Sequence, residues 1–381
     1  MTPARNAVGW AFFLNGLTFA SWVSRIPEVR ASFELNNGQL GLVLLAIATG
    51  SLVALPTTGA AIDALGTVRV VRIGAAVTGA GLFTAAVGLG VQLPMTVIGL
   101  FVYGLGIGVW DVAMNVEGAE VERRLGRAIM PRFHAGFSLG TVVGALVGAG
   151  LVAASVPAFA HLASVAVLAA GVTWWQAGAF LPVTEEAAVE SSSALRSWLE
   201  PRTLLIGVMV LALAMTEGTA NDWLAVALVD GHGASHAVGV AGFAGFVAAM
   251  TATRFVGTGL LDRFGRVKVL LATMVTAFVG VVLIVFADGW LVVAGILLWG
   301  AGASLGFPVG MSAAADDPER AAARVSVVST IGYAAFLAGP PLLGFVGDQV
   351  GTLKALLVVA AVLVPAALAV PATRPPMRTG P

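Results

Sequence analysis

Two pairs of carboxylate and amide residues lie inside long apolar segments of the sequence. Asp111 and Asn115 are four residues apart, and Glu217 and Asn221 repeat this spacing in the other half of the chain. Residues four apart share one face of a helix, so each pair would place a titratable group beside a hydrogen-bonding amide. Such pairs can carry protons and bind a hydroxyl-rich solute. The alternative is that Asp111 and Glu217 only tie helices together through buried hydrogen bonds.

Other polar residues lie in or near the same segments. Asp222 either belongs to the site or lies at the membrane interface. Arg254 either pairs with a carboxylate or a substrate anion, or extends to the interface along its aliphatic chain. His134 either relays protons or is a packing histidine. A second set of candidates for the site is Asn15, Trp299 and Tyr333.

Two further groups have simpler interpretations. The charged run from Glu117 to Arg124 predicts a solvated extension of a helix. Trp22 and Trp223 predict interfacial anchors, because tryptophan is enriched where membrane meets water. Stacking of a sugar on these two rings is the alternative.

The elements that must position these residues are membrane-spanning helices. A helix needs about 20 mostly apolar residues to cross the hydrocarbon layer. Ten segments qualify, and two of them are long enough for two crossings each, so the sequence predicts twelve spans. The segments are 6–24, 35–62, 73–110 (two spans, running on past Asp111), 133–184 (two spans), 203–228, 237–261, 269–287, 289–315, 325–347 and 355–373.

The positions of the basic residues predict the orientation. Cytoplasmic loops are enriched in Lys and Arg. With the amino terminus inside, sixteen of the 20 basic residues fall on the cytoplasmic side and three outside, and Arg254 lies within a span. We therefore expect a multi-pass protein of a bacterial inner membrane, with both termini cytoplasmic.

Composition excludes several other classes of protein. The chain is 58% hydrophobic and 10% charged, whereas a soluble domain has about 25% charged residues. It has no cysteine, which excludes disulfides and thiol catalysis. The net charge of zero does not by itself bear on nucleic acid, because a phosphate-binding surface needs clustered excess Lys and Arg, and we expect no nucleic-acid partner. No HExxH pattern and no cluster of histidines occurs, so we expect no enzyme activity, no bound metal and no cofactor, with the proton as coupling ion.

The two halves of the chain repeat one pattern. Residues 183–202 are the only long polar stretch and predict a linker between a bundle of residues 1–182 and a bundle of residues 203–381. Asp63 is echoed 199 residues later by Asp262, and Gly104 by Gly300. Such internal repeats are typical of transporters built from two related bundles around a central site.

The repeated loops resemble the signature of the major facilitator superfamily. The first copy comprises Gly59, Asp63, Gly66, Arg69 and Arg72, and the second comprises Asp262, Arg263, Gly265, Arg266 and Lys268. Ala64 and Thr258 depart from the usual pattern. The resemblance implies an all-α fold of twelve transmembrane helices in two pseudo-symmetric six-helix bundles.

The resemblance also implies a role for the loops. Asp63 would pair with Arg69, with Arg72 or with a helix of the other half, and so hold the protein closed on its cytoplasmic side. The alternative is that the arginines only determine topology. The sequences around Asp111 and His134 further resemble a bacterial subgroup near the fucose permeases.

Three functions remain in competition. The favoured one is proton-coupled symport of a small polar solute, of which a sugar is one possibility, by a monomer that works by alternating access in the lipid bilayer. The alternative is a drug or metabolite efflux antiporter. Leu100 occupies the position of the antiporter arginine, and 140–148 lacks the proline of the exporter signature, both of which argue against export. A non-transporting membrane sensor is the third.

Overall fold

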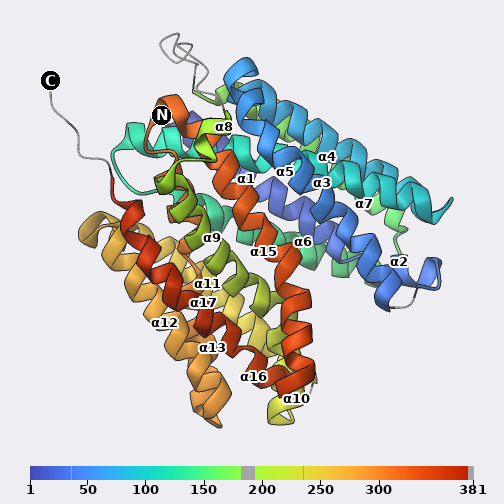
Figure 1. Cartoon of the computed structure of the whole chain (residues 1–381). Coiled ribbons are helices and arrows are strands. Elements are labelled where there is room, and N and C mark those ends of the chain that lie inside the picture. The colour runs from blue at the N-terminus through green and yellow to red at the C-terminus, as the bar shows by residue number, and fades with distance from the viewer. Residues whose placement is uncertain (36, 182–193, 235, 376–381) are drawn as a thin grey trace, which may run out of the picture. The chain divides into compact units, whose positions relative to one another are not determined.

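The computed structural model describes residues 1–35, 37–181, 194–234 and 236–375. These residues form helices and contain no β-strand (Figure 1). The first half comprises α1 (Thr2–Val23), α2 (Ile26–Ser32), α3 (Asn37–Leu65), α4 (Thr67–Leu89), α5 (Leu93–Leu125), α6 (Met130–Ala153), α7 (Ala158–Gln176) and a 3-10 turn, η1 (Ala177–Ala179).

The second half has the same succession with more interruptions. After α8 (Ala194–Ser197) come α9 (Pro201–Thr219), a π-helical turn η3 (Ala220–Leu224), α10 (Ala225–His232), α11 (His236–Phe264), α12 (Arg266–Phe286), α13 (Trp290–Ala303), α14 (Gly306–Ala314), η4 (Pro318–Arg320), α15 (Ala321–Val350), α16 (Thr352–Ala355), α17 (Leu357–Ala369) and η5 (Val370–Thr373). Most of the predicted linker, residues 183–193, lies outside the described residues.

Eleven helical segments of the described chain are long and apolar enough to cross a membrane. α1 is a twelfth helix of sufficient length, at 22 residues, but Asn6 and Asn15 lower its hydropathy. With α1 these segments account for the twelve predicted spans. Three of the later spans are each built from consecutive helices, namely α9–η3–α10, α13–α14 and α16–α17.

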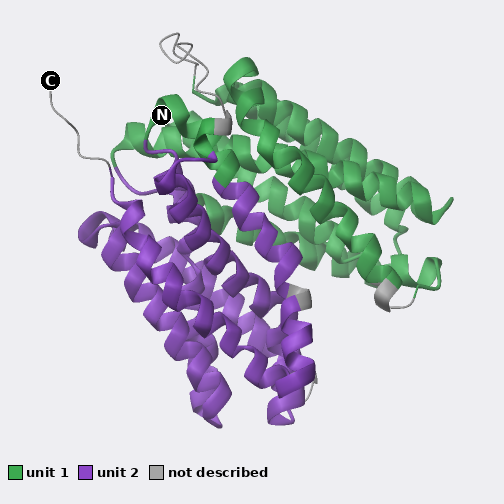
Figure 2. Ribbon diagram, in the orientation of Figure 1, with its two compact units in different colours: residues 1–126, 132–197, 317–327 green, residues 127–131, 198–316, 328–381 purple. Residues whose placement is uncertain are grey.

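The chain divides into two compact units (Figure 2). Unit 1 consists of residues 1–126, 132–197 and 317–327, and unit 2 of residues 127–131, 198–316 and 328–381. Each unit therefore includes one short segment from the other half of the sequence. Both segments belong to equivalent places in the repeat, because each joins a fourth span to a fifth span within its half.

Glycines allow close helix packing in both units. A methyl group added at Gly104 of α5 would lie 2.1 Å from the Ile47 carbonyl oxygen of α3, and one added at Gly300 of α13 would lie 2.3 Å from the Phe246 oxygen of α11. The repeated glycines thus perform the same task in both halves. Small residues at such contacts let helix backbones approach in lipid, where packing rather than water exclusion drives association.

The contact between α4 and α5 provides a test of this packing. A methyl group at Gly99 would lie 2.3 Å from the Ala85 amide nitrogen, so Gly99→Ala must push the two backbones apart. We expect a loss of about 1–3 kcal/mol of stability, measured as a lower unfolding temperature in detergent. Gly171→Ala is the matched control, because nothing lies within 4 Å of its added methyl group. An equal loss in the control would contradict this account.

Candidate functional site

In unit 1 the polar candidates form a connected group at α5 and α6. The Asn115 amide nitrogen donates to the Asp111 carbonyl oxygen at 2.9 Å and to its Oδ1 at 3.3 Å. Asn115 Oδ1 lies 3.2 Å from His134 Nε2. All three side chains are buried. The i, i+4 spacing therefore does join the carboxylate to the amide, and the fold adds the histidine.

The direction of these hydrogen bonds constrains one ring nitrogen of His134. Because the Asn115 amide NH₂ is directed to Asp111, its oxygen faces the imidazole and can only accept a hydrogen bond. His134 Nε2 must then carry a hydrogen. The ring of Phe12 packs edge-on against the imidazole, with centroids 4.9 Å apart. Hydrogen bonds thus connect the His134 imidazole of α6, through the Asn115 amide, to the Asp111 carboxylate.

In unit 2 the central feature is an ion pair between a buried arginine and a partly buried glutamate. Arg254 Nη2 of α11 lies 2.9 Å from Glu217 Oε2 of α9, and Arg254 Nε donates to the Ser304 carbonyl oxygen at 3.1 Å. The Arg254 side chain is only 4% exposed. A charge at this depth is costly unless it is paired, and the carboxylate and carbonyl together satisfy the guanidinium. Of the two positions considered for Arg254, the structure shows the paired one.

The second carboxylate–amide pair does not repeat the bonding of the first. Glu217 is paired with Arg254, whereas Asn221 and Asp222 are exposed and lie in the π-helical turn η3. This turn interrupts the α-helix after Thr219, two residues beyond Glu217, so the regular spacing predicted from the sequence ends before Asn221. Single π-turns inside α-helices are frequent at functional sites.

The second set of candidates is dispersed. Asn15 is buried in α1, and its amide nitrogen has no hydrogen-bond partner within the described structure. Trp299 is fully buried in the core of unit 2 against the edge of Phe246, with ring centroids 5.4 Å apart. Tyr333 packs between two phenylalanine rings. Trp22, expected at the interface, is instead buried in the core of unit 1.

The first signature loop packs on the start of α15. A methyl group at Gly59 would lie 2.9 Å from the Ala322 carbonyl oxygen, and Ser326 Oγ donates to the Leu55 carbonyl oxygen. Gly66 has a φ of 79°, a conformation that favours glycine, and starts α4 directly after the turn. The motif thus contacts α15, from the other half of the sequence, through the helix face that carries Gly59.

The ion pairs expected within this loop are not formed. In the described part of the chain Asp63 has no basic partner, and Arg69 is exposed. Arg72 points away from Asp63, because its Nε donates to the Trp174 carbonyl oxygen of α7 at 3.0 Å. The expectation that Asp63 pairs with Arg69 or Arg72 was therefore wrong for this structure.

The second signature loop also contacts the other half of the sequence. Asp262 Oδ1 accepts a hydrogen bond of 2.7 Å from the Ala128 amide, in the segment between α5 and α6. Gly265 has a φ of 77° and starts α12 as Gly66 starts α4. Arg263 and Lys268 are exposed, and the Arg263 guanidinium lies over the Phe264 ring. Both motif copies thus bind a segment that joins a fourth span to a fifth span.

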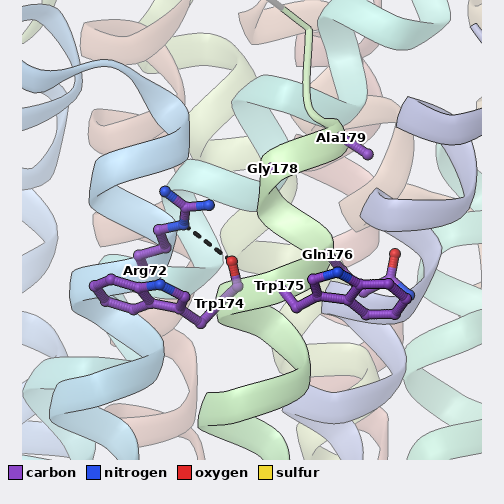
Figure 3. Close-up of a pocket in the computed structure, with 6 residues that line it drawn as sticks. All are labelled: Arg72, Trp174, Trp175, Gln176, Gly178 and Ala179. Carbon is purple, nitrogen blue, oxygen red and sulfur yellow. Dashed lines mark hydrogen bonds between the residues drawn. The ribbon is translucent and has the colours of Figure 1, made fainter.

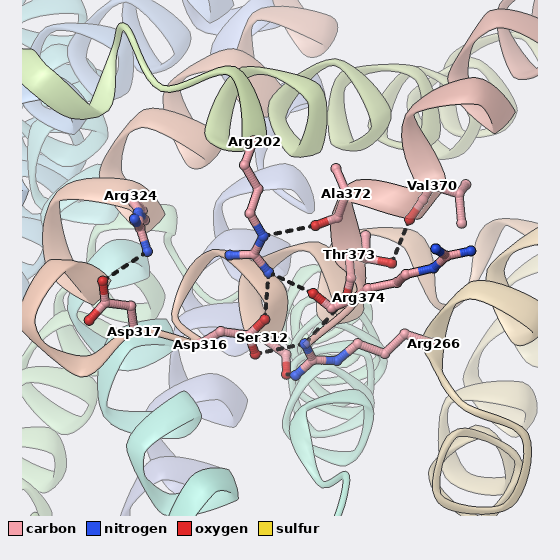
Figure 4. Close-up of polar contacts among 10 residues, drawn as sticks. All are labelled: Arg202, Arg266, Ser312, Asp316, Asp317, Arg324, Val370, Ala372, Thr373 and Arg374. Atoms are coloured by element: carbon pink, nitrogen blue, oxygen red, sulfur yellow. Dashed lines mark hydrogen bonds and ion pairs between the residues drawn. The ribbon is translucent and has the colours of Figure 1, made fainter. Parts of the chain in front are cut away.

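Arg266 of the second copy binds an aspartate that lies outside the motif. Arg266 Nη1 lies 2.7 Å from Asp316 Oδ1, and Arg202 Nη2 lies 2.6 Å from Asp316 Oδ2. The two arginines also donate to the backbone carbonyls of Ala372, Thr373 and Arg374 (Figure 4). This group, the Asp316 clamp, joins the ends of α9, α12, α14 and η5.

Glu117 has the corresponding place in unit 1. Its Oε2 accepts from Thr67 Oγ1 at 2.7 Å and its Oε1 from the Leu181 amide at 2.7 Å. Glu117 precedes Asp316 by 199 residues, the spacing of the signature loops. The prediction of a solvated extension was wrong for Glu117, since the start of α4 and the end of the sixth span cover it. The repeat spacing was the signal that could have found both acids.

Glu117→Ala tests this assignment. The change removes two hydrogen bonds to a carboxylate and leaves the buried Leu181 amide without an acceptor, so we expect a loss of about 2 kcal/mol. Glu120→Ala, which removes only surface ion pairs with Arg123 and Arg124, should cost less than about 1 kcal/mol. Thermal unfolding of the two purified variants gives the comparison, and equal losses would refute the buried role.

A further buried polar group lies where α1 meets α2. Arg25 is 2% exposed, and its Nε donates to His161 Nδ1 of α7 at 3.1 Å. Its Nη1 pairs with Glu28 at 2.8 Å. The two residues are 136 positions apart, and nothing in the sequence predicted this contact.

Comparisons with known proteins agree with the fold. A family model described as Major Facilitator Superfamily matches residues 204–381. The chain is 34% identical to the uncharacterized transporter y4wD of Sinorhizobium fredii, over 95% of this chain and 98% of that protein. It is 33% identical to an uncharacterized MFS-type transporter of Yersinia pestis, with 92% of each chain covered.

A solved structure is similar along almost the whole chain. The crystal structure of the transporter FucP in its outward conformation superposes with a TM-score of 0.82 over 97% of this chain and 98% of FucP, at 17% identity. Another structure of FucP, described as the E. coli fucose:proton symporter, gives a TM-score of 0.80. Together with the whole-length relatives, these matches identify a multi-pass membrane protein that belongs to the major facilitator superfamily of transporters.

Proposed function

We propose that this transporter carries a small hydroxyl-rich solute together with protons by alternating access. The observation that carries the proposal is that each half of the chain holds one acid within a membrane span, bound to polar partners. These are Asp111 with Asn115 and His134, and Glu217 with Arg254. Ionizable residues at membrane depth mark ion and substrate pathways by default.

The Glu217–Arg254 pair offers a direct means of coupling. The ionized carboxylate holds the guanidinium at 2.9 Å. A proton bound to Glu217 removes the negative charge, and the guanidinium then binds other acceptors more readily, including the hydroxyl oxygens of a solute. Solute binding and proton binding at this pair therefore favour one another. On the other half, Asp111 and His134 supply a second proton acceptor and a hydrogen-bond donor.

The signature loops supply the contacts that must break during transport. Gly59 packs on Ala322, and Asp262 binds the Ala128 amide. Alternating access needs contacts on one membrane face that form in one state and break in the other. We assign the two motif copies to this role on the cytoplasmic face, in a monomer whose termini both lie in the cytoplasm of a bacterium.

The solute class has support from the fold relative. FucP is described as a fucose:proton symporter. The buried groups here are amide, imidazole, carboxylate and guanidinium, all of which bind hydroxyl groups. No cofactor is needed for this cycle, since the proton gradient supplies the driving force.

Gradient-driven uptake tests the proposal. The full chain is reconstituted in liposomes, and radiolabelled sugars, polyols and carboxylates are offered with and without an inward proton gradient. We expect a hydroxyl-rich solute to accumulate only with the gradient. Asp288→Asn, at a side chain 99% exposed in a loop, is the matched control and should transport normally. Solute expulsion by the same gradient would favour the efflux antiporter, and a failure of every solute would favour a sensor.

A further inference from the structure

A pocket lies at one end of unit 1, between α4 and the end of α7. It has a volume of about 520 Å³ and is lined by Arg72 of α4 and by residues at the end of α7 and in η1, namely Trp174, Trp175, Gln176, Gly178 and Ala179 (Figure 3). None of the proposed solute-binding or proton-coupling residues takes part in it.

The pocket holds an oriented cation. The Arg72 guanidinium carbon lies 5.2 Å above the centre of the Trp174 ring, and Arg72 Nε donates to the Trp174 carbonyl oxygen at 3.0 Å. These two contacts hold the guanidinium in place and leave its two terminal nitrogens without a protein acceptor in the described structure. Gly178 lies close to Nη2, and its lack of a side chain keeps this edge open.

Arg72 has no acidic partner among the described residues. It forms no ion pair within the part of the chain that the structure describes. Neither α4 nor α7 contains an acidic residue. An arginine fork with free donors matches the geometry of a phosphate, to which it can donate two parallel hydrogen bonds.

The surroundings match a lipid rather than a soluble phosphate. Trp174 is 54% and Trp175 is 76% exposed, although both are large and apolar. Arg72 lies five residues inside the start of α4, or about 8 Å along its axis, and the two tryptophans lie at the end of α7. Exposed tryptophans and a basic residue at the ends of two spans are typical of the membrane–water boundary, where tryptophan is enriched and basic residues bind anionic headgroups.

We propose that this pocket binds the phosphate of an anionic glycerophospholipid, with Arg72 on the phosphate and the two indoles against the glycerol and upper acyl chain. The occupant belongs to the arginine-rich face of the membrane, which we assign to the cytoplasm. The bound lipid would join the start of α4 to the end of α7. This inference does not depend on the solute or on proton coupling.

Native mass spectrometry of the purified full chain tests the site, with phosphatidylglycerol, phosphatidylcholine and inorganic phosphate as separate probes. We expect phosphatidylglycerol to bind in preference to phosphatidylcholine. Arg72→Gln should weaken phosphatidylglycerol binding about five-fold and remove this preference. Arg72→Lys should keep part of the preference, because it retains the charge but not the fork. Arg69→Gln is the matched control, an exposed arginine one turn earlier, and should bind lipid like the wild type.

Three results would overturn the inference. They are unchanged lipid preference in folded Arg72→Gln, an equal loss in Arg69→Gln, and binding of inorganic phosphate as tight as that of the lipid. Thermal unfolding and size-exclusion chromatography establish that each variant is folded. If Arg72→Gln does not fold, Trp175→Ala changes only an exposed ring and replaces it, with the same expected loss of lipid binding.

Discussion

Glu217→Gln is expected to abolish accumulation of the solute while leaving solute exchange in place. A one-unit pH gradient supports about tenfold accumulation for each proton carried with the solute. The amide introduced at position 217 cannot take up a proton in this range, so the variant should reach an inside-to-outside ratio of about one. Exchange of labelled for unlabelled solute needs no net proton movement and should persist.

The same change has a structural cost that must be separated from coupling. Glu217→Gln leaves the buried Arg254 with the Ser304 carbonyl and without its carboxylate partner. Removal of one partner of a buried pair is more costly than removal of both. The double variant Glu217→Gln with Arg254→Gln should therefore be more stable than the single variant and equally uncoupled. Restored accumulation in the double variant would show that the defect was one of folding.

Asp316→Ala should strongly destabilise unit 2. Asp316 is 10% exposed and binds two arginines, at 2.6 and 2.7 Å. Its loss leaves two neighbouring guanidinium groups without their shared carboxylate, although backbone carbonyls and the Ser312 hydroxyl still accept hydrogen bonds from them. We expect a cost of about 3 kcal/mol in the free energy of unfolding. This value is at the lower end of the range for breaking a buried ion pair, because Arg202 and Arg266 are partly exposed to solvent. The unfolding temperature should fall by about 6 °C or more.

The neighbouring residue provides the control for this measurement. Asp317 is 34% exposed and binds Arg324 at 3.2 Å. Asp317→Ala should cost less than about 1 kcal/mol, as expected for a surface ion pair. Equal losses from the two adjacent changes would show that the Asp316 clamp does not hold the ends of unit 2 together.

The spans and the repeat could be predicted from the sequence because they depend on composition and spacing alone. Apolar length predicts a crossing whatever it packs against. The repeated glycines at 104 and 300 were predicted as equivalents, and both meet a backbone carbonyl of the neighbouring helix. The bond from Asn115 to Asp111 follows from helical spacing in the same way.

The partners of the charged residues could not be predicted, because they come from distant segments. Arg254 binds Glu217, which lies 37 positions away, and Glu117 binds residues 50 and 64 positions away. The charge of Glu117 suggested that its side chain is exposed to water, yet Thr67 and Leu181 bind it and the side chain is buried. The π-helical turn after Glu217 has no signal in residue type, so the predicted repeat of the Asp111–Asn115 arrangement failed there.

Proton-coupled symport requires that solute and protons move together in one direction. Liposomes that contain the full chain and a trapped pH-sensitive dye measure this directly when the transported solute is added outside without a gradient. We expect the lumen to acidify as the solute enters, and we expect the double variant Asp111→Asn with Glu217→Gln to carry no protons into the lumen. Solute entry with no change of lumenal pH, or with alkalinisation of the lumen, would contradict proton-coupled symport.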